Sequence, residues 1–113
     1  MPASPIVERI TEAIRDAFKG FAPEKVVPDV EGVMEHLVDI PDALAESLKG
    51  LASRLEDDLP IHAAVPEALR DLIPVVEGLR ERFAEANTIF RREHEQELKQ
   101  HYEPRAGEKA WNV

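Results

Sequence analysis

The feature that most constrains this chain is a run of apolar residues at alternating spacings of four and three. It extends without a gap over residues 65–90, as Val65, Leu69, Leu72, Val76, Leu79, Phe83, Ala86 and Phe90. This is the period of a helix that packs along another helix. The same period occurs upstream, as Val30, Met34, Leu37, Pro41, Leu44, Leu48, Leu51 and Leu55. If the chain reverses near Pro60, the two runs meet layer by layer, and Leu48 faces Leu72. We therefore predict a long antiparallel helical hairpin of the coiled-coil type.

A third and shorter apolar pattern precedes the hairpin. Ile6, Ile10, Ile14 and Phe18 recur every four residues, after a serine and a proline that suit a helix start. The sequence thus predicts an all-α fold with a single helical domain over residues 1–102 and helices at about 5–20, 29–59 and 64–102. Residues 103–113 combine proline, glycine and charged groups, and are predicted to form a flexible C-terminal tail.

Two prolines fall inside the predicted hairpin helices. Pro41 lacks a backbone donor and clashes with the preceding turn, so we expect a kink or a break near Val38–Pro41. Asp42 would then cap the restarted helix, as Asp29 would cap the start of the 29–59 helix. Pro74 lies in the body of the last helix, on the outer side of the predicted seam. At the level of the sequence, a kink and a break both stay open at these two prolines.

Composition excludes several classes of function. The net charge of −9 repels phosphate backbones, so we expect no nucleic acid partner. The chain has no cysteine, and no apolar run reaches the roughly 20 residues of a membrane span, so we expect no membrane insertion. The first residues lack a basic-then-apolar leader pattern. These features predict a soluble cytoplasmic protein, with leaderless export left open.

The residues that most resemble a reactive site lie near the end of the last helix. Glu93, Glu97 and His101 share one helix face, next to His94. The Glu-x-x-His spacing of di-iron bundles is absent, however, and we interpret the group as the solvated end of a helix. Ser47 and Ser53 lie in mid-helix without a visible base. We therefore predict no catalytic residue, no cofactor and no metal, and expect that the protein is not an enzyme.

Two candidate partner-binding sites follow from the pattern. The first is an apolar groove that no other segment clearly covers, and it predicts a homodimer, with residues Val38, Ala45, Ala52 and Ile73. On the other side of the hairpin, the first helix is expected to act as a cover. The second site is the tail, where an isolated tryptophan fits a short linear motif, with residues Pro104, Arg105, Trp111 and Val113. Folding of Trp111 back onto the bundle is the alternative.

An acidic, cysteine-free helical hairpin with such a tail resembles the ESAT-6/WXG100 class of small secreted helical proteins. The resemblance covers residues 30–113 at the level of architecture. The Trp-x-Gly turn of that class is absent, and Ala106 stands where its Tyr-x-x-x-Asp/Glu tail signal, counted from Tyr102, requires an acid. The ending Pro-Arg-Ala-Gly-Glu-Lys-Ala-Trp-Asn-Val is also similar to that of small helical proteins of actinobacterial conjugative elements.

Both resemblances imply the same kind of role. It is that of a non-catalytic, dimeric helical module whose tail docks on a translocation ATPase of a secretion or conjugation system. The alternative is a phage or plasmid structural protein or chaperone adaptor. A ligand-binding or lipid-binding bundle is a further reading.

Overall fold

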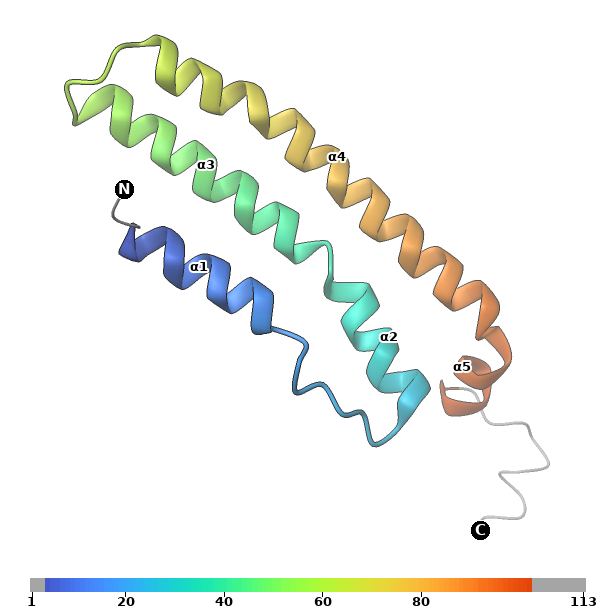
Figure 1. The fold of residues 1–113 in the computed structure, drawn as a ribbon. Coiled ribbons are helices and arrows are strands. Elements are labelled where there is room, and N and C mark those ends of the chain that lie inside the picture. The colour runs from blue at the N-terminus through green and yellow to red at the C-terminus, as the bar shows by residue number, and fades with distance from the viewer. Residues whose placement is uncertain (1–3, 103–113) are drawn as a thin grey trace.

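The computed structural model describes residues 4–102, and in this range the chain is all-α, as predicted (Figure 1). The helices are α1 (Pro5–Asp16), α2 (Val26–His36), α3 (Asp39–Asp57), α4 (Ala64–Glu93) and α5 (Glu95–Tyr102). Helices α2 and α3 follow one another along one arm of a hairpin, and α4 forms the other arm (Figure 1). The molecule is elongated, with extents of 70 × 27 × 22 Å. The predicted helical hairpin is therefore present, with one arm in two pieces.

The break in the first arm lies just before Pro41. Helix α2 ends at His36 and α3 begins at Asp39, so Pro41 stands in the first turn of α3, where its missing N–H has no intrahelical acceptor to lose. His36 and Asp39 bridge the break at 3.2 Å. The expected cap, Asp42, lies inside α3 instead, where it pairs with Arg80 of α4 at 3.0 Å.

The start of the first arm also differs from the prediction. Helix α2 begins at Val26, three residues before the expected start at Asp29. The Asp29 carboxylate, from within the first turn, accepts hydrogen bonds from the backbone N–H groups of Glu24 and Lys25, at 3.0 and 3.2 Å. It thus orders the chain that enters the helix, although it does not occupy the capping position.

The second arm ends earlier than the predicted helix 64–102. It begins at Ala64 as expected, and Pro74 lies inside α4 without ending it. At His94 the backbone leaves the helical region, with φ −114° and ψ 22°. Helix α5 then turns back and packs against α2, and its Leu98 is buried (Figure 1). A single helix over 64–102 is therefore wrong.

The seam between α3 and α4 is rotated by about one residue from the predicted one. The most buried side chains are Pro41, Ala45 and Ala52 of α3 and Pro66, Ile73 and Val76 of α4. Small alanine and proline side chains thus occupy much of the seam, and Leu48 packs against the cluster of Ala45, Ile73 and Val76. Leu44, Leu51 and Leu72, which were predicted to lie in the seam, stand at its side and are 43–48% exposed.

This rotation overturns the predicted open groove. Ala45 and Ala52 are 4% and 0% exposed, and Ile73 packs with Ala45 and Val76 in the core. Val38 lies at the junction of α2 and α3 and is partly buried. Ala45, Ala52 and Ile73 therefore belong to the interior of one chain and are not available as a contact surface for a second copy.

Candidate interaction surface

The residues displaced from the seam form one continuous apolar surface. We call it the leucine face, and it consists of Leu44 and Leu51 of α3 and Val65, Leu72 and Leu79 of α4. Each of the five is between 43% and 48% exposed. They recur every seven residues on both helices, which keeps them in line along a packed helix pair. Both antiparallel arms are rotated in the same sense relative to the seam, so the two rows lie on the same side of the hairpin.

Several positions that border the leucine face carry small or uncharged residues, although Arg54, Asp71 and Arg82 also adjoin it. One helical position away from its leucines, α3 has Ala43, Ser47 and Gly50, and α4 has Ala68 and Val75, all exposed. In a chain with a net charge of −9, such a stretch departs from the rest of the surface. Depletion of charge around exposed apolar side chains is typical of the centre of a protein–protein interface.

The opposite side of the hairpin is closed by ion pairs. Arg80 pairs with Asp42 at 3.0 Å, Lys49 with Glu77 at 3.9 Å, and Arg70 with Glu56. All three join α3 to α4, and their side chains are 39–59% exposed. Such exposed pairs contribute little stability but suit a solvated surface. The hairpin therefore has one charged, hydrated side and one apolar side.

Helix α1 presents a second apolar surface. Ile6, Ile10 and Ile14 are 50–68% exposed, and no residue of α1 is buried. The helix is well specified locally, since the Ser4 hydroxyl accepts from the Val7 N–H at 3.4 Å and Pro5 occupies the first turn. It is absent from the main contacts between helices, which involve α2, α3, α4 and α5. The expectation that the first helix covers the hairpin is therefore wrong for a single copy.

A polar cluster fixes the other end of the hairpin. The Glu31 carboxylate of α2 is 5% exposed; it accepts from the Arg91 guanidinium at 2.6 Å and from the Tyr102 hydroxyl at 2.8 Å. The hydrogen bond to Glu31, followed by desolvation, raises the pKa of Tyr102. This cluster ties α2, α4 and α5 together. The sequence pattern does not indicate this cluster, because Glu31 lies far from both partners along the chain.

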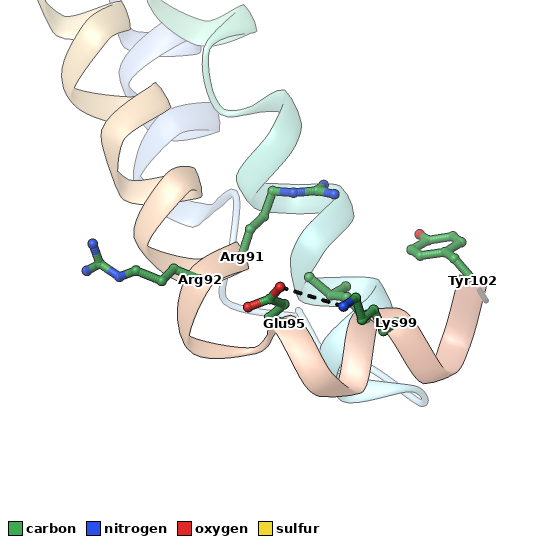
Figure 2. A pocket seen from close by; sticks show the side chains of 6 residues that line it. Arg91, Arg92, Glu95, Lys99 and Tyr102 are labelled. Atoms are coloured by element: carbon green, nitrogen blue, oxygen red, sulfur yellow. Dashed lines mark ion pairs between the residues drawn. The ribbon is translucent and has the colours of Figure 1, made fainter. Parts of the chain in front are cut away.

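A shallow hollow beside this cluster is lined by basic side chains. Figure 2 shows Arg91 pointing toward α2, Arg92 pointing away from it, and Lys99 against Glu95. Each of these cations pairs with a carboxylate: Arg91 with Glu31, Arg92 with Glu93 at 3.6 Å, and Lys99 with Glu95 at 4.0 Å. With their charges already matched, these side chains have a structural role rather than that of an anion site.

The predicted chemical candidates do not assemble. His94 contacts Glu97 at 2.9 Å, while Glu93 lies with Arg92. Among residues 4–102, no group of three histidine or acidic side chains is arranged to hold a metal ion. His62 is exposed, and its Nδ1 accepts from the Ala64 N–H at 3.0 Å at the start of α4. The tail candidates Pro104, Arg105, Trp111 and Val113 lie outside the described residues.

Comparison of the chain with protein-family models, with curated proteins and with solved structures gave no match. Across residues 4–102, none of the helices combines the length and apolarity that a membrane crossing requires. The leucine face and the exposed isoleucine stripe of α1 are therefore the two candidate interaction surfaces of the described residues.

Proposed function

We propose that this chain is a non-catalytic helical interaction module that forms a homodimer through its leucine face. The observation that supports it is the asymmetry of the hairpin. One side is closed by ion pairs between the arms, and the other exposes five large apolar side chains in heptad register. A second copy offers a surface of matching apolar character and spacing, as the two arms of a symmetric helical dimer require.

The exposed area supports the same proposal. The chain has an accessible surface of 9045 Å². Helix α1 contributes to this area, because none of its residues is buried, and the molecule is elongated, with extents of 70 × 27 × 22 Å. A standard interface buries roughly 800 Å² per partner. The elongated shape therefore leaves ample surface for a second copy to cover.

The proposed module also docks on a translocation ATPase of a secretion or conjugation system through residues 103–113. This part of the proposal is supported by the resemblance of the hairpin and its ending to modules of such systems. The segment holds the sole tryptophan, Trp111, and buried tryptophans commonly anchor interfaces. Within the module, the cluster at Glu31 would fix the direction in which α5 leads into this segment.

Sedimentation analysis of a matched pair of variants tests the dimer. We expect twice the monomer mass for the wild-type chain at micromolar concentration. Leu51→Asp places a charge in the leucine face and should give a helical monomer. Ser53→Asp introduces the same charge at an exposed position two residues along α3, off the leucine face, and should leave the dimer intact. A wild-type chain that stays monomeric, or equal effects of the two variants, would contradict the proposal.

A further inference from the structure

Helix α1 is too short and too bare to be stable by itself. It has 12 residues, a length at which isolated helices are marginal in water. Its stripe of isoleucines continues beyond the helix with Phe18, which is 52% exposed. A local sequence this well suited to an amphipathic helix indicates that a complementary surface covers the stripe.

The leucine face matches α1 in length. At 1.5 Å per residue, the 12 residues of α1 span about 18 Å, and the α4 side of the leucine face, from Val65 to Leu79, spans about 21 Å. A helix laid along the face would form a three-helix arrangement with α3 and α4. Its isoleucine stripe would then meet the half-exposed leucines, so that both apolar surfaces leave water together.

Charge also distinguishes α1 from the rest of the chain. Helix α1 carries a net charge of only −1, because its three acids are offset by two bases: Glu8, Glu12, Asp16, Arg9 and Arg15. Of the net charge of −9, the remainder of the chain therefore carries −8. Direct contact of two hairpins brings two acidic bodies together, whereas a nearly neutral helix can approach the same face with less repulsion.

These observations identify the occupant of the leucine face. We propose that α1 of each copy packs on the leucine face of the second copy, so that the dimer forms by exchange of the N-terminal helices. This inference rests on the proposed dimer and names the segment that makes it. Docking of α1 on its own hairpin would cover both surfaces within one chain and leave nothing to join two copies. Exchange of an identical element is a low-cost route to a dimer.

A complementation experiment tests the exchange with two full-length variants. Ile10→Asp places a charge in the apolar stripe of α1 and keeps the leucine face. Leu51→Asp places a charge in the leucine face and keeps α1 unchanged. Each variant alone should be a monomer that keeps its folded hairpin, since both positions are half-exposed, but has a lower helicity than the wild type, because its α1 is undocked. Their mixture should form a heterodimer, because α1 of the Leu51→Asp chain can still pack on the leucine face of the Ile10→Asp chain. With one contact of two left, we expect its dissociation constant to exceed that of the wild type by about tenfold or more.

Thr11→Asp and Ser53→Asp serve as controls. They place the same charge on α1 outside its isoleucine stripe and on α3 outside the leucine face, and should leave the dimer unchanged. If Ile10→Asp still dimerises while Leu51→Asp does not, two hairpins meet directly; the exchange is then wrong and the dimer stands. If the wild type dimerises but the mixture of variants stays monomeric, the exchange is also wrong. A monomeric wild type instead contradicts the proposed dimer itself.

Discussion

The two ends of the hairpin are held together by different kinds of contact. Between α3 and α4, the interior consists of apolar side chains such as Ala45, Ala52 and Ile73. Where α2, α4 and α5 meet, the most buried polar group is the Glu31 carboxylate, with a cation and a phenol around it. The stability of the α3–α4 seam depends on the volume of its apolar side chains and on the absence of charge. The stability of the Glu31 cluster depends on each polar group having a partner, so different substitutions should weaken the two regions.

The largest effect is expected for a charge placed in the α3–α4 seam. Ala52 is fully buried, and Ala52→Glu would put an unpaired carboxylate between two closely packed helices. We expect a loss of more than about 3 kcal/mol in the free energy of unfolding. Ser53→Glu, one residue along and exposed, should change it by less than about 0.5 kcal/mol. Chemical denaturation measures both, and a stable Ala52→Glu protein would contradict the rotated seam.

A neighbouring pair of truncations measures the register of the seam. Ile73 is 8% exposed and Leu72 is 48% exposed. In a monomeric Leu51→Asp background, Ile73→Ala should cost about 2–4 kcal/mol, because it leaves a cavity, and Leu72→Ala about 1 kcal/mol or less. Denaturant unfolding of the two variants gives the difference directly. The reverse order would restore the heptad register predicted from the sequence.

At the other end, neutralising the buried carboxylate should have a smaller effect. Glu31→Gln keeps the shape of the side chain but weakens its hydrogen bonds to Arg91 and Tyr102. Because Arg91 is 51% exposed and can turn to water, we expect a loss of only about 1–2 kcal/mol. Glu46→Gln, at an exposed position of α3 away from the cluster, is the control. Equal denaturation midpoints for the two variants would show that the cluster contributes no stability.

The smallest expected effect concerns the titration of Tyr102, the sole tyrosine. Its pKa is raised by the hydrogen bond to Glu31 and by desolvation, so folding favours the protonated phenol. The contribution to stability is complete at pH values below the pKa of the unfolded chain and is lost as the pH rises through the raised pKa. Ultraviolet absorbance of the tyrosinate follows this titration. Glu31→Gln should shift it to lower pH, and an unchanged curve would rule out the hydrogen bond in solution.

The positions of the helices could be predicted from the sequence. The rotation of α3 and α4 about their own axes, which decides the residues that face the seam, could not. Periodic apolar residues locate both arms, and the rule that proline disrupts a helix interior locates the break before Pro41. The rows through Leu44 and Leu51 and through Ala45 and Ala52 have the same spacing, however, so periodicity alone cannot say which row faces α4. The choice depends on how closely the backbones approach and on the ion pairs that join the arms. These are properties of the pair of helices rather than of either sequence segment.

The candidate surface was only partly predictable for a related reason. The stripe of α1 is evident from its spacing of four, but the expected cover over the hairpin is not formed within the described chain. The leucine face was visible as a set of residues and was assigned to the interior. Glu31 gave no signal, because one charged residue in a helix acquires meaning only when Arg91 and Tyr102 reach it from distant parts of the chain.

Helix α4 is shared by both ends of the hairpin, and this gives unfolding a definite order. It is one continuous 30-residue helix, and both α3 and α2 pack on it. Opening of the Glu31 cluster releases α5 and α2 while α3 and α4 stay together. Opening of the α3–α4 seam deprives α4 of its main packing partner, and because α2 and α5 also pack on α4, we expect the whole hairpin to unfold together. Native-state hydrogen exchange should accordingly show slow amides in α3 and the facing half of α4, and faster ones in α2 and α5.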